Sequence, residues 1–382
     1  MTRLAYVANI RLPTEKAHGI QIMKTCEALS RQGIKVELIV PRRLNRIKHE
    51  SFEFYGVEKN FKITKLWCLD LISLNIFGAV GFWLESWTFY RAVKKYLRKQ
   101  NEAIYYTRDL PIAYWLSQDV SPLYYEIHTL PERITLKYRE AWQQAKGLVV
   151  ISDGLKNELL KQGVSENKIL VARDAVDVEQ FMKLESKDAY RKVFNLPKDK
   201  KIVIYTGHLY EWKGAGILAE ATRLLSRTSG IEIYIVGGTP NDIDTFKNKY
   251  GNIEHLHIIG WQDHKSIPFW LKAADILVIP TSAKEKIGAD YTSPMKLFEY
   301  MMAERPIVAS DIPSSREILS DSTAFFFKPD DPVSLAATLK KVMANYTKAE
   351  AMAEKACEEV AEKYSWEKRA NFIKHFIFGI YE

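Results

Sequence analysis

The chain has 382 residues, a formal net charge of +8 and a hydrophobic fraction of 47%. This apolar content excludes a disordered protein, and the length is typical of two globular domains. Its three cysteines, Cys26, Cys68 and Cys357, are far apart and lack any C-x-x-C spacing. A disulfide scaffold is therefore excluded, and we expect a reducing compartment.

The basic excess lies in the first half of the chain. Residues 1–176 contain 27 Lys and Arg against 18 Asp and Glu, whereas residues 177–382 contain 28 against 29. A one-sided surplus of this kind indicates an anionic partner. Nucleic acid, a phosphorylated substrate and an acidic membrane surface are the classes to consider.

The sequence opens on MTRLAYVANI, which predicts a short strand and lacks the apolar segment of a signal peptide. The longest uncharged run, Leu71–Leu84, is interrupted by Ser, Asn and Gly. A membrane-spanning helix needs about 20 apolar residues, so this run is too short. We therefore expect a cytoplasmic protein, at most peripheral on the inner face of the cell membrane.

Short runs rich in Val, Ile and Tyr alternate with segments of helical periodicity along the whole chain. This alternation predicts βαβ units and parallel sheets. Because an open twisted sheet rarely exceeds about ten strands, we expect two doubly wound domains. The first set of predicted strands is Leu4–Ala8, Lys35–Val40, Ile63–Leu66, Ala103–Thr107, Leu123–Ile127, Gly147–Ile151 and Ile169–Ala172. The second set is Ile202–Thr206, Glu232–Val236, His255–Ile259, Ile276–Pro280, Pro306–Ala309 and Thr323–Phe327, and predicted helices include Gly19–Gln32, Ser152–Gln162 and Ala215–Arg227.

The predicted domain boundary lies in Arg173–Asp177, which precedes a polar segment punctuated by Pro197. We expect one domain over residues 1–176 and the other over 177–364, with a last helix over 365–382. Ligands in open α/β sheets bind at the carboxyl ends of the strands, so candidate site residues are sought there.

The most informative motif follows the strand that ends at Pro280. A polar loop leads to Ser293-Pro294, a pair that predicts Ser293 as the N-cap of a helix. The free N–H groups of that helix start, its dipole and the Lys296 ammonium would together form a phosphate site. Glu299 follows one turn later, within reach of sugar hydroxyls. The alternative is a well-capped helix with a surface Lys and Glu.

The second motif is the segment 205–214, which reads YTGHLYEWKG at the end of a predicted strand. Gly207 allows the chain to turn there. His208 and Lys213 would then reach the same sheet edge as Lys296. Cations from two loops at one edge favour a phosphate-bearing ligand.

Together the two motifs resemble the donor half of the retaining glycosyltransferases of family 4, also called group 1, which have the GT-B fold. The resemblance covers the whole chain in the same order. Lys16–Gly19 is similar to the glycine loop of the family, and Tyr125–His128 ends a strand where the family keeps a histidine. Arg173–Asp177 is similar to the interdomain segment, and the helix after Ser365 to the one that crosses back to the N-terminal domain. The resemblance implies an α/β protein of two Rossmann-like domains that face a central cleft: an acceptor domain, then a donor domain.

The resemblance also implies roles for individual residues. Lys213 would neutralise the donor pyrophosphate together with Lys296, and Glu299 would bind the nucleotide ribose. His128 would line the sugar site beside the reacting carbon, and Gly19 would let the backbone approach the phosphates. The remaining implied donor contacts are Gly207, His208, Asp290, Ser293 and Pro294.

The sequence departs from the family pattern at two positions. His208 stands where the family usually has Arg, and Tyr291 stands where it has a glutamate that contacts the donor sugar. Asp290 or the backbone at Ser293-Pro294 is expected to replace that contact. Lys296 is expected to compensate for the missing Arg.

The implied reaction transfers a sugar, with retention, from a UDP- or GDP-sugar to a glycan or lipid-linked acceptor. Breaking the sugar–phosphate bond develops negative charge on the pyrophosphate, where one fixed donor contributes about 3–4 kcal/mol. Lys213, Lys296 and helix N–H groups would supply this stabilisation with no metal ion and no cofactor.

Two other enzyme classes remain open. Residues 214–219 read GAGILA, which fits the G-x-G-x-x-A fingerprint of an NAD(P)-dependent oxidoreductase, with Glu232 as the acidic residue. Against it, a polar segment separates Thr206 from Gly214, whereas the first glycine should follow the strand directly. A sugar-nucleotide epimerase or hydrolase of the same fold is the other alternative.

The segment Asp242-Ile-Asp244 has the spacing of a D-x-D metal motif, but we interpret it as the start of a helix.

The basic N-terminal half contains a further group of aromatic and basic residues. The segment Phe77–Lys99 is first aromatic and then basic. We interpret it as a helix on the N-terminal sheet, and the alternative is an interfacial element on anionic lipid. Nucleic acid is not expected, because no helix-turn-helix or RNA-binding signature accompanies the charge. One face of this helix is predicted to carry Phe82, Phe89, Val93 and Leu97, and a separate basic loop carries Arg42, Arg43, Arg46 and Lys48.

Overall fold

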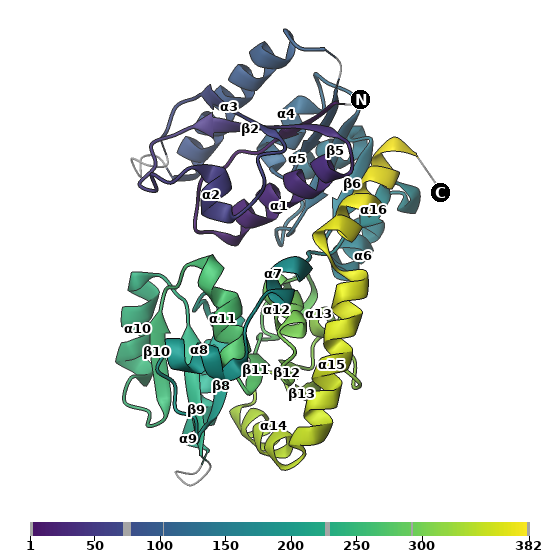
Figure 1. Ribbon diagram of the computed structural model, residues 1–382. Coiled ribbons are helices and arrows are strands. Elements are labelled where there is room, and N and C mark those ends of the chain that lie inside the picture. The colour runs from purple at the N-terminus through teal and green to yellow at the C-terminus, as the bar shows by residue number, and fades with distance from the viewer. Residues whose placement is uncertain (1–2, 72–77, 102, 226–229, 292, 380–382) are drawn as a thin grey trace. The chain divides into compact units, whose positions relative to one another are not determined.

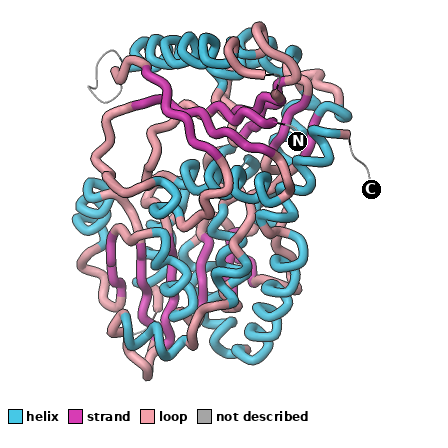
Figure 2. The backbone as a smooth tube through the Cα atoms, turned by 45° about the horizontal axis from the view of Figure 1, so that its top comes forward, coloured by secondary structure: helices cyan, strands magenta, loops and turns pink. Residues whose placement is uncertain are grey.

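The computed structural model describes residues 3–71, 78–101, 103–225, 230–291 and 293–379. Contacts within the chain divide it into two units, Met1–Arg173 with Trp366–Glu382, and Asp174–Ser365 (Figure 1). Each unit has its own parallel sheet, and in each the strands lie between helices (Figure 2). The division lies within a few residues of the boundary expected from the sequence.

The first unit contains a seven-stranded parallel sheet in the order β3-β2-β1-β4-β5-β6-β7. In this register Leu4 of β1 lies opposite Val36 of β2 on one side and Ile104 of β4 on the other. The strand order therefore reverses between β1 and β4, and that is where such sheets bind ligands. The strands are β1 (Arg3–Val7), β2 (Lys35–Arg42), β3 (Lys62–Trp67), β4 (Ile104–Thr107), β5 (Leu123–Ile127), β6 (Gly147–Val150) and β7 (Ile169–Val171).

Helices cover both faces of this sheet, because the strands of a parallel sheet are apolar on both sides. On one face, Phe89 and Val93 of α3 (Gly78–Leu97) and Ile112 of α4 (Leu110–Leu116) are fully buried in one core with β1, β2, β4 and β5. Phe82, which was predicted to share that buried face, is instead 38% exposed.

The last helix, α16 (Trp366–Phe378), packs against α1 (Ala17–Arg31) of the same unit. The hydroxyl of Tyr124 on β5 donates a 2.9 Å hydrogen bond to the carbonyl of Ile377. The prediction that the final helix returns to the N-terminal domain is therefore confirmed. The other helices of this unit are α2 (Ser51–Tyr55), α5 (Leu136–Gln144), α6 (Asp153–Lys161) and the 3-10 turn η1 (Glu166–Lys168).

The second unit contains a six-stranded parallel sheet in the order β10-β9-β8-β11-β12-β13, so its strand order reverses between β8 and β11. One apolar core lies under α7, α8, α11, α12 and α15, and a second lies under α9, α10 and α14 on the opposite face. The strands are β8 (Lys201–Thr206), β9 (Ile231–Val236), β10 (Leu256–Gly260), β11 (Ile276–Ile279), β12 (Ile307–Ser310) and β13 (Phe325–Phe327). The α-helices are α7 (Val178–Met182), α8 (Lys187–Val193), α9 (Ala215–Arg223), α10 (Pro240–Tyr250), α11 (Ile267–Ala273), α12 (Met295–Met302), α13 (Pro313–Arg316), α14 (Pro332–Ala344) and α15 (Tyr346–Lys363).

Every strand predicted from the sequence is present among the described residues, and no end differs by more than two positions. The predicted helix Ala215–Arg227 ends at Arg223 as α9, and its positions 226 and 227 lie outside the described residues. No described helix combines the length and the apolar character needed to cross a bilayer.

Candidate functional site

The candidate site of the second unit lies where its strand order reverses, beyond the ends of β8 and β11. The chain leaves β8 at Gly207, whose φ of +131° favours glycine. A Cβ added to Gly207 would lie only 2.7 Å from the Nζ atom of Lys296. The glycine therefore makes room for an ammonium group directly at the end of the strand.

Lys296 belongs to the first turn of α12 and is anchored to β8. Its Nζ atom donates a 2.6 Å hydrogen bond to the carbonyl of Thr206 and lies 4.1 Å from the ring centroid of Tyr205. Burial, and then the neighbouring charge of Lys213, lower the pKa of Lys296 well below its usual value.

Lys213 ends the 3-10 turn η2 (Glu211–Lys213), and its Nζ atom lies 3.9 Å from the ring centroid of Trp212. Burial lowers the pKa of Lys213 to about 8. The next residue, Gly214, has φ +76°, and a Cβ there would lie 1.7 Å from the carbonyl oxygen of Pro280. This close approach holds the loop of Lys213 against the residue that follows β11.

No carboxylate among the described residues forms an ion pair with Lys213 or Lys296. Two neighbouring ammonium groups in a partly buried place disfavour each other's charge. An anionic ligand between them would remove this penalty, so the arrangement is suited to a phosphate group.

The start of α12 differs from the prediction in one respect. Ser293 is not the N-cap: Pro294 holds that position, and no side chain of the described residues caps the helix. Ser293 lies one residue further out, only 3% exposed, and its Oγ atom has no hydrogen-bond partner among the described residues. The first-turn N–H groups therefore receive no side-chain cap from the part of the chain that the structure describes, which leaves them available to a phosphate group.

Glu299 lies one turn into α12. Its Oε1 atom is 3.1 Å from Nε2 of His264, a residue of the 3-10 turn η4 (His264–Ser266). His264 was not among the predicted site residues, because it follows β10, whereas the two motifs follow β8 and β11.

The remaining predicted donor contacts lie on the loops of the same unit. The ring of His208 stacks on that of Tyr210 at a centroid distance of 5.0 Å, and its carbonyl accepts a 2.6 Å hydrogen bond from Tyr205. Asp290 is half-buried in a single π-helical turn, Ile287–Tyr291, between β11 and α12. Lys296 thus approaches Gly207 directly and lies near enough to Lys213 and Glu299 for their charges to affect its pKa, so these four residues lie together.

The first unit holds the other predicted catalytic residue, His128, directly after β5. Its Nε2 atom lies 2.6 Å from Oε1 of Glu126, which is completely buried. The same carboxylate accepts 2.6 Å hydrogen bonds from Gln21 and Arg369 and a further one from the hydroxyl of Tyr106. Burial alone would raise the pKa of Glu126. The neighbouring charges of Arg369 and His128 outweigh this effect and hold the pKa well below its usual range.

Arg369 ties this network to the last helix. Only 3% of it is exposed, and besides Glu126 it donates to Thr25 (3.1 Å) and to the carbonyl of Arg173 (3.0 Å). Arg108, directly after β4, adds a 2.7 Å hydrogen bond to Gln21. Sequence reasoning missed this network around Glu126, the carboxylate that His128 contacts.

Gly19 lies inside the first turn of α1 and not in a loop before it, because the helix begins at Ala17. A Cβ on Gly19 would lie 2.2 Å from the hydroxyl of Tyr55, which bonds both the N–H and the carbonyl of Thr14. The contact that requires glycine here is therefore with Tyr55. A role of Gly19 toward the donor stays a prediction.

The geometry does not fit the dinucleotide fingerprint. Gly214 is separated from β8 by η2, and Glu232 lies near the amino end of β9, away from the edge where ligands bind. The carboxylate of Glu232 is engaged by His255 (3.1 Å) and His257 (2.7 Å).

The D-x-D segment is part of a helix start, as interpreted. Asp242 forms a capping box with Thr239 at the beginning of α10. Among the described residues, no group of three or more His, Cys, Asp or Glu side chains is placed to hold a metal ion.

Two doubly wound units, one with paired lysines at the point where its strand order reverses, define an α/β protein with a cationic site where such sheets bind ligands. The family described as Glycosyl transferases group 1 matches residues 186–359, and Glycosyltransferase Family 4 matches residues 19–180. The chain therefore belongs to the family 4, or group 1, glycosyltransferases.

Curated relatives agree with this assignment. An alpha-D-kanosaminyltransferase of Streptomyces kanamyceticus is 26% identical over 62% of this chain and 62% of its own length. A phosphatidyl-myo-inositol mannosyltransferase of Mycolicibacterium smegmatis is 29% identical over 55% of this chain and 50% of its own. The similarity thus spans less than two thirds of either relative.

Solved structures resemble the chain over nearly its whole length. Sucrose-phosphate synthase from Thermosynechococcus elongatus has a TM-score of 0.80 at 17% identity, with 98% of both chains covered. Anabaena HepE in complex with UDP-glucose has a TM-score of 0.76 at 14% identity, with 100% of both covered. These likenesses show the fold, which is GT-B.

Proposed function

We propose that this protein is a retaining glycosyltransferase that moves a sugar from a UDP- or GDP-sugar to a glycan or lipid-linked acceptor. The observation that carries the proposal is the pair of neighbouring lysines, Lys213 and Lys296, beside the end of β8 and the start of α12. The nucleoside diphosphate in HepE and the transferase names of the relatives support the same ligand class.

The proposed reaction follows from the charges at this site. The bond between the anomeric carbon and the β-phosphate oxygen breaks, and its electron pair stays on the nucleoside diphosphate. The acceptor oxygen bonds the same face of that carbon, and its proton passes to the departing phosphate oxygen. Lys213, Lys296 and the N–H groups of α12 stabilise the developing negative charge.

The other site residues take supporting roles in this proposal. Glu299 binds the ribose hydroxyls, and His128 contacts the donor sugar, with Gly19 near the phosphates. In the family, a glutamate contacts the donor sugar. In this chain Asp290 or the backbone at Ser293 makes that contact. No metal ion or further cofactor takes part in this proposed reaction. The acceptor binds to the basic N-terminal unit, at the surface of an anionic membrane.

A thermal-shift screen tests the nucleotide class. With UDP, GDP, ADP, NAD and NADP compared at equal concentrations, UDP or GDP is expected to raise the unfolding temperature most, because ligand binding to the folded state stabilises it. A shift with NAD or NADP and none with UDP or GDP would contradict the proposal and favour an oxidoreductase. Consumption of the donor without any acceptor would instead favour the epimerase or hydrolase.

Nucleotide affinity is expected to fall as the pH rises through about 8, because the pKa of Lys213 lies there in the free protein. Above this pH the ammonium is neutral and no longer attracts the diphosphate. If only the charged form binds, the Kd at pH 9 is about tenfold higher than at pH 7. Calorimetric titration with UDP or GDP measures this, and Lys213→Met is expected to flatten the profile. A wild-type Kd that is unchanged between pH 7 and 9 would contradict the assignment.

A further inference from the structure

Helix α3 carries one stripe of exposed side chains on the outside of the first unit. Val80, Leu84, Trp87, Arg91 and Lys95 follow each other at steps of three or four residues and share one helix face. All five are exposed: Val80 by 72%, Leu84 by 44% and Trp87 by 42%. Arg98 continues the stripe just beyond Leu97, since its N–H still bonds the carbonyl of Lys94.

The stripe is apolar at one end and basic at the other, and it contains no acidic residue. Arg91, Lys95 and Arg98 form no ion pair among the described residues, whereas Lys94, beside the stripe, pairs with Asp119. The guanidinium of Arg91 lies 5.4 Å from the ring centroid of Trp87, where the apolar and basic parts meet.

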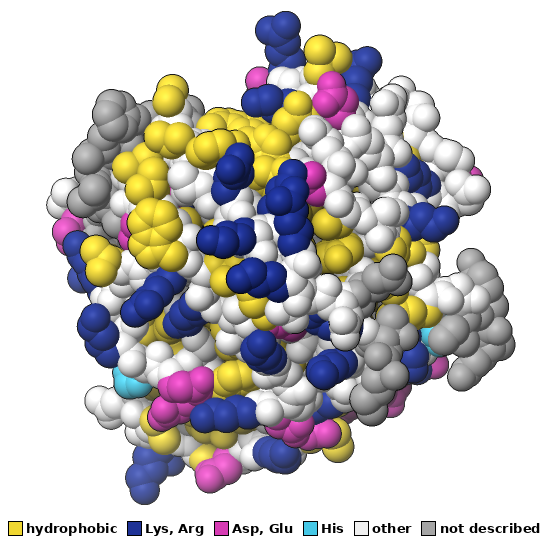
Figure 3. Space-filling view, turned by 90° about the horizontal axis from the view of Figure 1, so that it is seen from above, with side chains coloured by type: hydrophobic (Ala, Val, Ile, Leu, Met, Phe, Trp, Pro, Cys, Tyr) yellow, Lys and Arg dark blue, Asp and Glu magenta, His cyan; other side chains and the backbone are white. Residues whose placement is uncertain are grey.

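The edge strand β3 adds a second tryptophan beside the basic end. Trp67 closes β3, is 69% exposed, and lines a groove of about 710 Å³ together with Trp87, Arg91, Lys95 and Arg98. Seen from the side where α3 lies, Lys and Arg side chains gather next to hydrophobic ones on this face (Figure 3).

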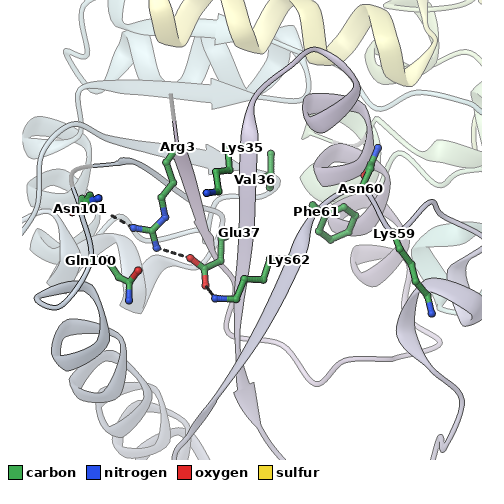
Figure 4. A pocket seen from close by; sticks show the side chains of 10 residues that line it. All are labelled: Arg3, Lys35, Val36, Glu37, Lys59, Asn60, Phe61, Lys62, Gln100 and Asn101. Atoms are coloured by element: carbon green, nitrogen blue, oxygen red, sulfur yellow. Dashed lines mark hydrogen bonds and ion pairs between the residues drawn. The ribbon is translucent and has the colours of Figure 1, made fainter. Parts of the chain in front are cut away.

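Another groove in the same unit contains basic side chains whose charges are neutralised by a carboxylate of the same unit. It lies at the amino ends of β1–β3, and there Arg3 and Lys62 both pair with Glu37, which Tyr96 also bonds (Figure 4). Those cations have an internal partner. Among the residues that the structure describes, the three cations of the α3 stripe have no such carboxylate, and they lie beside exposed apolar side chains.

We propose that the α3 stripe and the groove beside Trp67 bind the surface of an anionic lipid bilayer. Val80, Leu84 and Trp87 enter the boundary between headgroups and acyl chains, and the groove cations contact lipid phosphates. A basic amphipathic helix with Trp at the boundary is the kind of element that lies in a membrane interface. Exposed aliphatic side chains have no partner on a nucleic-acid backbone, which disfavours that ligand. The inference does not depend on the donor or on the reaction.

Co-sedimentation of the full chain with vesicles tests this proposal. With phosphatidylcholine vesicles containing about a third phosphatidylglycerol, we expect binding at low salt that weakens as salt rises, and little binding to pure phosphatidylcholine. The variant that combines Arg91→Gln, Lys95→Gln and Arg98→Gln is expected to bind at least tenfold more weakly. All three side chains are exposed, so the variant is expected to fold and to keep the thermal shift with UDP or GDP.

The matched control removes three exposed lysines from α14 and α15 of the other unit, Lys340→Gln, Lys341→Gln and Lys355→Gln. It has the same net charge as the test variant and is expected to bind the vesicles like the wild type. Equal losses in the two variants would mean that only the overall charge matters and would overturn the proposal, as would no binding by the wild type.

Brominated lipids report whether the apolar end enters the bilayer. They are expected to quench tryptophan fluorescence in the wild type, and Trp87→Phe is expected to remove part of that quenching. The control Trp261→Phe, which changes a residue 53% exposed in the other unit, is expected to leave the quenching unchanged. Charge-dependent binding without any Trp87 signal would overturn the bilayer assignment in favour of a soluble anionic partner.

Discussion

Replacing Lys296 or Lys213 with Met is expected to lower kcat by about 10²–10³-fold each, which corresponds to the loss of one well-placed donor to a developing oxyanion. Met keeps most of the side-chain volume and removes the ammonium group. Because the fold disfavours the charge of both lysines, neither substitution is expected to lower the unfolding temperature of the free protein by much. Loss of activity without loss of stability separates a role in catalysis from a role in folding.

Lys340→Met is the matched control, since it removes an exposed lysine on α14, outside both motifs. It is expected to leave kcat and the nucleotide-induced thermal shift unchanged. Near-normal turnover in both Lys213→Met and Lys296→Met would refute the proposed stabilisation of the leaving group.

Replacing Glu126 with Ala is expected to destabilise the protein by about 3–5 kcal/mol, because it leaves the buried guanidinium of Arg369 without its carboxylate. Equilibrium unfolding in urea measures the change. In a double-mutant cycle with Arg369→Met, the combined loss is expected to be smaller than the sum of the single losses. The pKa of Glu126 is depressed in the folded state, so this stabilisation is present at neutral pH and is lost as the pH falls below about 4.3.

Glu166→Gln is the control for this second prediction, since it breaks an exposed ion pair with Lys156 in the same unit. Surface pairs contribute little, so the unfolding midpoint is expected to stay where it is. Strictly additive losses for Glu126→Ala and Arg369→Met would show that the two side chains are not coupled.

The strands were predictable because each is a short apolar run between turn residues. In a parallel sheet both faces are buried, so a strand such as Ile202–Thr206 is almost continuously apolar and stands out from the amphipathic helices. The lysines of the second unit were predictable for a related reason. Both follow strands at the reversal of strand order, and the chain places such loops at one edge of the sheet.

The network around Glu126 was not predictable, because its members are distant in the sequence. Gln21 and Arg369 lie 105 and 243 residues from Glu126 and meet it only once α1 and α16 have packed together. The same holds for Trp67 and Trp87, which share a groove only because β3 is the edge strand next to α3.

The position of the helix cap was predicted wrongly. Ser is preferred at the N-cap and Pro at the first helical position, so the pair Ser293-Pro294 predicts Ser293 as the cap. The structure gives it to Pro294, and the hydroxyl of Ser293 is buried without a partner among the described residues.

Calorimetric titration of UDP and GDP into the wild type and into the double variant Lys213→Met/Lys296→Met tests whether the paired lysines hold the diphosphate. We expect one of the two nucleotides to bind the wild type with one-to-one stoichiometry, and the double variant, still folded, to bind it at least 100-fold more weakly. Equal affinity in the two proteins would show that the paired lysines do not hold the diphosphate.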